Sequence, residues 1–357
     1  MRLLICFKLP QTSNNSSFVR SFISEVKLTN QTYRTNAMYD DKQILNYFKE
    51  IEEVTSQYTN LWSINLYAPM ILVDFEQMRI FANEVDERDI LKAQGAIYSA
   101  TLPSDLMIAN TAVEWSGKRW AMIILPLPKN KKDRINLLAH ELFHVAQPQL
   151  GFKLFSPDNK HLDDKDGRIY LRLELEALLT ALTDLTNRKE HLRAALSFRQ
   201  YRQYLYSTSK QTENQLELNE GIAEYTGFII ADRNLKETIL HFKKSFDAFI
   251  ENPTFVRSFA YQTIPLYGYL LKDAGEKYEG WHKKISVDTN LTEFFRQSFE
   301  IGNLIEESEL WKLKKYKAEQ IIKEENIREV TKRKKISDYI HKYIDSPRLE
   351  LPLKNTN

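Results

Sequence analysis

The chain has 357 residues, of which 43% are hydrophobic and 27% are charged. This length can form one large domain or two modest ones, and this hydrophobic content is enough to bury a core. Because 50 basic and 48 acidic residues nearly cancel, there is no sustained positive field to attract a phosphate backbone, and we expect no nucleic-acid partner.

No segment is apolar over the length that a membrane helix needs. The longest apolar run, WAMIILPLP at 120–128, is far shorter than the ~20 residues required, so we expect no transmembrane segment. Lys8 and Pro10 end a short apolar patch at the start, so we expect no intact signal peptide. The compartment stays open, because a start codon assigned too late would remove such a signal. The lone Cys6 excludes an internal disulfide and a cysteine zinc site, which leaves His and carboxylate side chains as metal ligands.

The first part of the chain predicts a small sheet. Residues 1–38, rich in Ser, Asn and Thr, are typical of a loosely ordered N-terminal arm. A helix is expected from about residue 40, and Ser116 and Gly117 favour a hairpin between the last two strands. We therefore expect an α+β subdomain at 39–130 with a mostly antiparallel sheet. Runs of β-branched and aromatic residues predict its strands at 70–75, 78–83, 96–102, 107–115 and 119–127.

After Lys132 the apolar residues follow helical spacing, which predicts a helical subdomain at 131–345. Strands first and helices afterwards indicate an α+β fold rather than alternating βαβ units. We interpret KRKK at 332–335 as the solvated face of an amphipathic helix, because acidic residues are interleaved upstream. At 346–357 we expect a C-terminal strand, PRLELPL, and a tail.

The segment DRINLLAHELFHVAQ at 133–147 carries the strongest chemical signal. Its apolar spacing predicts a helix, with Asp133 placed to cap its start. On that helix His140 and His144 project from one face, close enough to bind one Zn²⁺. Glu141 lies beside them and can take a proton from metal-bound water, whose pKa zinc lowers to ~7.

Two ligands do not complete a catalytic site, and the best third ligand is in LELNEGIAEYTGFIIADR at 216–233. Helical spacing places Glu220 and Glu224 on one face, and glycines at 221 and 227 allow another helix to approach closely. Two such carboxylates repel each other unless a cation lies nearby. We assign Glu220 as the ligand and Glu224 to orienting a histidine. A solvated acidic face is the alternative.

Glu174 is a rival acid, because it falls within an apolar stripe of the predicted helix YLRLELEALLTAL at 170–182. A carboxylate in that stripe needs a partner, which could be Arg172, Arg168 or the metal site. We expect a structural role for Glu174, or a role in supporting the metal ligands.

Together, HELFH at 140–144 and NEGIAEY at 219–225 resemble the gluzincin clan of zinc metallopeptidases, particularly its aminopeptidase branch, whose helices carry HExxH and NEGxAxY. The resemblance implies a zincin-like fold, Zn²⁺ as cofactor and a peptide or protein substrate. It also implies that His140, His144 and Glu220 are the ligands and that Glu141 is the general base.

The chain departs from the aminopeptidases in two places. The segment between His144 and Glu220 is much longer, which could remodel the substrate cleft, and the GxMEN motif that holds the substrate amine is missing. Glu114 on a predicted strand could replace that motif, or it could form a plain cross-strand charge pair.

Zincin-like folds place an edge strand before the HExxH helix, where it pairs with the substrate backbone. We expect RWAMIILPLP at 119–128 in that place, because prolines suit an edge or a strand end; an ordinary buried strand is the alternative. Gluzincins also stabilise the oxyanion with a Tyr or His downstream of the third ligand. We assign this role to Tyr261, with Tyr267 second, although an aromatic residue in an apolar run is commonly core.

The sequence therefore predicts a zinc metallopeptidase that uses zinc-activated water and Glu141. Two alternatives stay open. The first is a non-catalytic peptide-binding or scaffold protein with a vestigial or structural zinc site. The second is a zinc hydrolase that acts on a non-peptide bond, since one scaffold can host several chemistries. The oligomeric state and the cleaved bond are open as well.

Overall fold

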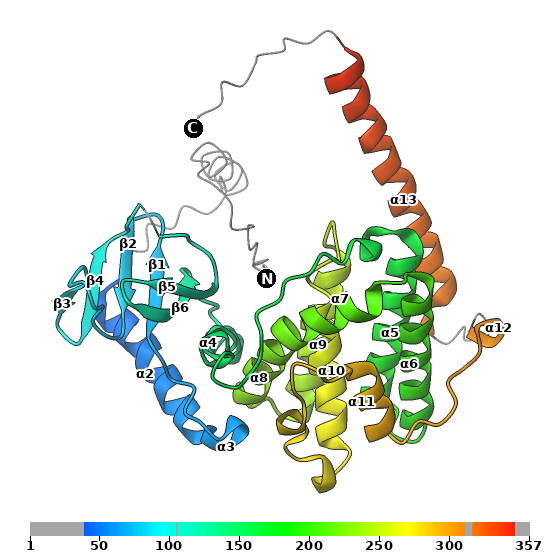
Figure 1. The fold of residues 1–357 in the computed structure, drawn as a ribbon, viewed down its shortest axis with the longest axis horizontal. Coiled ribbons are helices and arrows are strands. Elements are labelled where there is room, and N and C mark those ends of the chain that lie inside the picture. The colour runs from blue at the N-terminus through cyan, green and yellow to red at the C-terminus, as the bar shows by residue number, and fades with distance from the viewer. Residues whose placement is uncertain (1–38, 105, 311–315, 347–357) are drawn as a thin grey trace. The chain divides into compact units, whose positions relative to one another are not determined.

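The structure is a computed structural model that describes residues 39–104, 106–310 and 316–346. Its fold is mixed, with one six-stranded sheet and a larger number of helices (Figure 1). The predicted N-terminal arm at 1–38 and the predicted C-terminal strand from 347 onward lie outside the described residues.

The strands form one sheet in the order β3-β4-β2-β1-β6-β5. Only β1 and β6 run parallel, and the other four neighbouring pairs are antiparallel, which confirms the expected mostly antiparallel sheet. The strands are β1 Met70–Asp74, β2 Arg79–Ala82, β3 Lys92–Gln94, β4 Ile97–Thr101, β5 Thr111–Trp115 and β6 Lys118–Ile124. Each of the five predicted strands is present. The short β3 was missed, because its residues are exposed or half-buried and carry no apolar alternation.

β5 and β6 form the predicted hairpin. Ser116 and Gly117 both have left-handed backbones, with φ of 47° and 87°, as a two-residue turn between twisted strands requires. The expectation that 119–128 is the edge strand was wrong, because β6 lies between β1 and β5, and β5 is the edge. Pro126 and Pro128 lie beyond the end of β6 at Ile124, so they leave its ladder intact.

The sheet is buried on both faces at its centre. Ile71, Val73 and Met122 are fully buried on one face with Trp120. The intervening residues of β1 and β6 are equally buried, and the helices α2 (Asp41–Gln57) and α4 (Lys131–Ala146) pack against strands of the sheet. The helix α4 therefore lies against a fully buried part of the sheet.

The described chain divides into two compact units. The first comprises residues up to 156 together with 217–238 and 280–288, and the second comprises 157–216, 239–279 and the residues from 289 onward. This division differs from the boundary that we expected at 130/131. The helix that carries HELFH belongs with the sheet because it packs against β5 and β6.

The helices of the first unit include the two that carry the HELFH and NEGIAEY motifs. They are α2 Asp41–Gln57, α3 Thr59–Trp62, α4 Lys131–Ala146 and α8 Ile222–Ile230, with a π-helical turn at Glu217–Gly221 before α8 and a 3₁₀ turn at Trp281–Lys284. Asp133 is not the cap of α4. Asn130 is, and its side-chain oxygen accepts a hydrogen bond from the backbone N–H of Asp133 at 3.1 Å. Asp133 instead pairs with Arg233.

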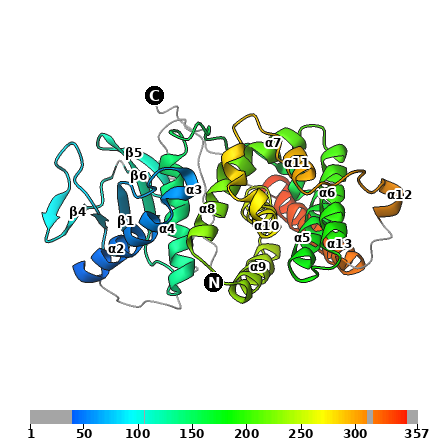
Figure 2. The ribbon, with the colours of Figure 1, turned by 90° about the horizontal axis from the view of Figure 1, so that it is seen from below.

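The second unit is helical, and α5 and α6 pack against each other (Figure 2). α5 (Lys165–Thr183) contains the helix predicted at 170–182, which is confirmed. The α-helices here are α5 Lys165–Thr183, α6 Arg188–Leu205, α7 Ser209–Leu216, α9 Leu235–Ile250 (whose first turn belongs to the first unit), α10 Ala260–Asp273, α11 Leu291–Ser298, α12 Glu307–Leu310 and α13 Ala318–Ile340. Shorter turns occur at Lys160–Asp163, Glu276–Tyr278 and His341–Asp345. Within the described ranges, no helix combines the length and the apolarity needed to cross a bilayer.

Candidate metal centre

The centre is built on α4, whose second half is almost entirely buried. His140, Glu141 and His144 are each less than 7% exposed, and one ligand atom from each lies within 4.8 Å of the others. Helical periodicity puts the two imidazoles on one face, one turn apart. Because α4 packs between the sheet and α8, that face points into the protein.

A glycine brings α8 unusually close to α4. A Cβ atom on Gly227 would lie 2.3 Å from the backbone oxygen of Asn136 and 3.0 Å from its Nδ2 atom, so only glycine fits there. The expected close approach at Gly227 is confirmed. It places the π-helical turn that precedes α8 within reach of the two imidazoles.

Glu220 of that turn completes a triangle of ligand atoms. The Nε2 atoms of His140 and His144 are 3.0 Å apart, and Glu220 Oε2 lies 3.6 Å from the first and 3.3 Å from the second. Ligands about 2.0 to 2.1 Å from a tetrahedral zinc ion are separated by about 3.3 Å from one another. The three atoms are therefore spaced as such an ion requires.

The turn that carries Glu220 differs from the regular helix that the sequence predicted over 216–233. Residues Glu217–Gly221 are π-helical, a form found mostly as single turns at functional sites. From this turn Glu220 contacts His140 at Nε2, whereas Glu224 contacts the same imidazole at Nδ1. The two acids therefore reach opposite nitrogens of one ring.

The Nδ1 atom of His140 is held by Glu224. Glu224 Oε2 lies 2.9 Å from Nδ1, and Glu224 Oε1 accepts a hydrogen bond of 2.8 Å from Asn136 Nδ2. A carboxylate at Nδ1 keeps the proton there and directs the Nε2 lone pair toward a metal. This is the contact that the orienting role of Glu224 requires.

Gln147 holds the Nδ1 atom of His144, as Glu224 holds that of His140. This contact was not predicted from the sequence. The Oε1 atom of Gln147 lies 2.6 Å from His144 Nδ1, while its Nε2 donates to the backbone oxygen of Asn219 at 2.7 Å. That second bond identifies Oε1 as the atom facing the imidazole, so Nδ1 of His144 is the donor. The available signal was the position of Gln147 three residues after His144, at the C-cap of the same helix.

The arrangement favours a cation among the ligand atoms. When each Nδ1 donates, each Nε2 presents a lone pair, and these two lone pairs face each other beside the carboxylate of Glu220. Burial lowers the pKa of His140, but hydrogen bonds with Glu220 and Glu224 outweigh it and raise this pKa to about 10. Burial raises the pKa of Glu220, but the attraction of His144 and the hydrogen bonds with both histidines hold it well below its usual value. A positive charge is stabilised here, whether it is a proton or a metal ion.

Glu141 is a buried carboxyl group beside this triangle. Its Oε2 atom has no hydrogen-bond partner among the described residues. Burial raises the pKa of Glu141 to about 7, although His140 and His144 act in the opposite direction. A buried carboxyl oxygen without a protein partner is available to bond a water molecule or a substrate atom.

Glu114 forms the cross-strand charge pair that we considered as the alternative to an amine anchor. Glu114 and Arg119 are paired residues of β5 and β6, and their side chains meet at 2.8 Å. Arg119 also donates to the backbone oxygen of His144 at 3.1 Å, which ties the hairpin to the end of α4. The pair therefore has a structural role between the edge strand β5 and α4.

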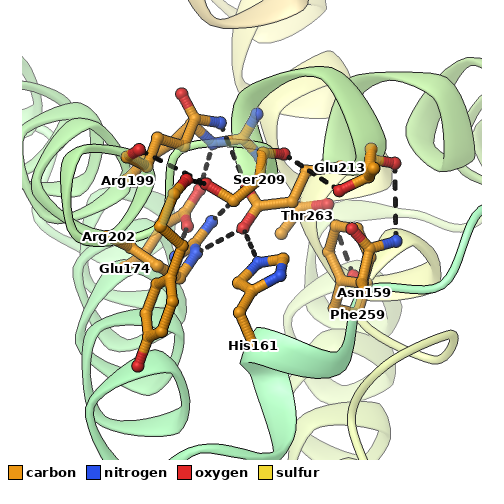
Figure 3. Close-up of polar contacts among 12 residues, drawn as sticks. Asn159, His161, Glu174, Arg199, Arg202, Ser209, Glu213, Phe259 and Thr263 are labelled. Carbon is orange, nitrogen blue, oxygen red and sulfur yellow. Dashed lines mark hydrogen bonds and ion pairs between the residues drawn. The ribbon is translucent and has the colours of Figure 1, made fainter.

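Glu174 lies in the second unit, in a fully buried cluster of charges (Figure 3). Its Oε1 accepts from Arg199 Nε at 2.6 Å, and its Oε2 accepts from Arg202 at 2.7 Å. Arg202 also holds Glu213 through two hydrogen bonds, of 2.8 and 2.9 Å. These partners satisfy the structural role expected of Glu174. They differ from Arg168 and Arg172, which bind Glu325 instead.

Tyr267 joins the same cluster, because its fully buried hydroxyl donates to Glu174 Oε1 at 3.0 Å. This contact accounts for its burial without an oxyanion role. Tyr261, the first choice for that role, is partly buried on α10 of the second unit. Its role stays a prediction.

Comparison of the chain with models of protein families, with curated proteins and with solved structures found no match in any of the three. The resemblance to gluzincins therefore depends on the two motifs and on the geometry of the centre.

Proposed function

We propose that this protein is a zinc-dependent peptidase with His140, His144 and Glu220 as the metal ligands. The observation that carries the proposal is the triangle of Nε2, Nε2 and Oε2 atoms, with edges of 3.0, 3.3 and 3.6 Å. Two imidazoles and one carboxylate are the ligand set of catalytic zinc sites, which leave the fourth position open. Ligands of this borderline kind suit zinc better than magnesium or calcium.

Glu141 is the proposed general base. A bound zinc ion would supply a Lewis acid and lower the pKa of its water to ~7. The carboxyl of Glu141 then needs only to accept a proton at Oε2 and pass it to the leaving amine. Its burial beside His140 and His144, with Oε2 unpaired among the described residues, supports this role.

The choice of a peptide as substrate is supported by the open edge of the sheet. β5 has one strand neighbour, β6, among the described residues, and it packs against α4. The other side of such a strand offers backbone donors and acceptors to an extended chain, which is how many proteins recognise peptides. In zincin-like folds, to which we assign this unit by the resemblance, substrates bind at this place.

The decisive experiment compares wild type with Glu141→Gln on a library of fluorogenic peptides, with zinc content measured on the same samples. We expect one zinc per chain in both proteins and a loss of turnover of at least ~100-fold in the variant, since general base catalysis contributes 10²–10⁴-fold. Glu84→Gln is the matched control, because Glu84 is a half-exposed acid of the same unit that pairs with Lys118.

Three outcomes would count against parts of the proposal. Zinc binding without cleavage of any peptide favours a hydrolase of another bond or a non-catalytic binding protein. Turnover that survives in Glu141→Gln removes Glu141 as the base. Zinc that binds equally well to Glu220→Ala removes Glu220 as the third ligand.

A further inference from the structure

The first half of α13 packs against α5, and its last part extends beyond this contact. Glu325, in its first half, is fully buried and bonded to Arg168 and Arg172 of α5. From residue 331 to residue 345 every residue is exposed, through the end of α13 and the π-helical turn His341–Asp345. Figure 1 shows this part of α13 running past α5 and α6 of the same unit. We call residues 332–345 the projecting segment.

The projecting segment carries an exposed apolar stripe. Ile336, Tyr339, Ile340 and Tyr343 are spaced at i, i+3, i+4 and i+7, which places them on one face. They are 48%, 60%, 43% and 58% exposed, and the two tyrosine rings lie 6.0 Å apart. Scattered exposed apolar residues are ordinary, but four on one face of a helix mark an interaction surface.

The same segment is strongly basic. Asp338 lies two residues from both Ile336 and Ile340, so it faces away from the stripe. Lys342 Nζ lies 5.0 Å from the centre of the Tyr343 ring, at the border of the stripe. Five basic residues stand against two acidic ones: Lys332, Arg333, Lys334, Lys335 and Lys342 against Asp338 and Asp345.

Charge decides among the possible occupants of this stripe. A second copy would bring two sets of five basic residues together, which like-charge repulsion disfavours. An anionic surface neutralises them. Isoleucines and tyrosines on one face, with lysines at the border, are the composition of helices that lie in the boundary of a bilayer without crossing it.

We propose that the projecting segment binds the surface of an anionic lipid bilayer, with Ile336, Tyr339, Ile340 and Tyr343 facing the lipid. Lys335 and Lys342, at the border of the stripe, reach the headgroups, where each basic residue strengthens binding about fivefold. This proposal is independent of the metal centre. The structure confirms that KRKK at 332–335 lies exposed on a helix, and the proposal adds a lipid surface as the partner of this helix.

The test is sedimentation of the full chain with vesicles of phosphatidylcholine and phosphatidylserine, in a ratio of about 2:1, and with vesicles of phosphatidylcholine alone. We expect binding to the anionic vesicles only, weakened by high salt. Lys335→Gln/Lys342→Gln should weaken binding roughly twentyfold, as the loss of two basic residues at the border of the stripe implies. Ile336→Gln/Ile340→Gln should weaken it at least ~tenfold through lost apolar burial.

Ser337→Gln is the control, because it adds a polar helix-forming residue beside the stripe and should leave binding unchanged. Circular dichroism on each variant checks that the helix persists. Binding that is equal for both kinds of vesicle, or equal for wild type and both double variants, overturns the proposal. It is also overturned if wild type is a dimer without lipid and Ile336→Gln/Ile340→Gln makes it a monomer, since the stripe would then bind a second copy.

Discussion

Replacing Gly227 by alanine tests whether the close contact of α4 and α8 builds the metal centre. The added Cβ would lie 2.3 Å from the backbone oxygen of Asn136, whereas ordinary contacts begin near 3.4 Å. This oxygen belongs to the backbone and cannot rotate away as a side chain could. The two helices must therefore separate by about an ångström. Overpacking of this kind costs about 1–3 kcal/mol, and the better helix propensity of alanine recovers up to about 1 kcal/mol. We therefore expect the free energy of unfolding to fall by about 1–2 kcal/mol.

The same change should weaken metal binding, because Asn136 holds the carboxylate that orients His140. Separation of the helices lengthens the 2.8 Å bond between Asn136 Nδ2 and Glu224 and carries Glu220 away from the imidazoles. Loss of an outer partner of this kind typically lowers metal affinity 10- to 100-fold. Urea unfolding measures the stability, and competition with a chromophoric zinc chelator measures the affinity.

Gly302→Ala is the matched control, because nothing lies within 4 Å of a Cβ atom at that position. We expect its stability to stay within about 0.5 kcal/mol of wild type, with zinc affinity unchanged. If Gly227→Ala were instead more stable than wild type, as helix propensity alone predicts, and bound zinc normally, the contact between α4 and α8 would not support the centre.

Four further predictions concern the metal centre and the buried charges of the second unit. Glu224→Gln should bind zinc 10- to 100-fold more weakly in the chelator assay, and unchanged affinity would contradict its orienting role. Free zinc at about 100 times its dissociation constant should raise the free energy of unfolding by about 2.7 kcal/mol, seen as a higher melting temperature that a chelator reverses. Glu174→Gln should lower the free energy of unfolding, measured with urea, by about 3–5 kcal/mol, because buried guanidinium groups lose their carboxylate. A loss of zinc affinity without this destabilisation would contradict the position of Glu174 among the arginines. Burial raises the pKa of Glu213, but Arg202 outweighs it and holds this pKa far below its usual value of about 4.3. The stability from this depressed pKa is present above pH ~4 and lost as the pH falls further, so Glu213→Gln should flatten the acid limb of the stability profile.

Local patterns in the sequence determined five of the six strands, the helix that carries HELFH and half of the candidate centre. The apolar spacing in 133–147 sets the helical register, and that register alone puts His140 and His144 on one face with Glu141 beside them. Alternating apolar residues and a Ser-Gly turn likewise determined the β5–β6 hairpin. These features depend on neighbours within a few residues along the chain.

Tertiary packing decided which acid meets the two imidazoles. Glu174 and Glu220 are both acids in apolar helical segments, and although the NEGIAEY pattern favoured Glu220, helical periodicity alone does not say which of them meets the histidines. The structure places Glu220 against the histidines and Glu174 among buried arginines, because Gly227 lets α8 approach α4. The orientation of His144 by Gln147, and the position of β5 rather than β6 at the sheet edge, were decided in the same way. Contacts between segments distant in sequence depend on which surfaces pack best across the whole unit, and the periodicity of one segment carries no information about its partner.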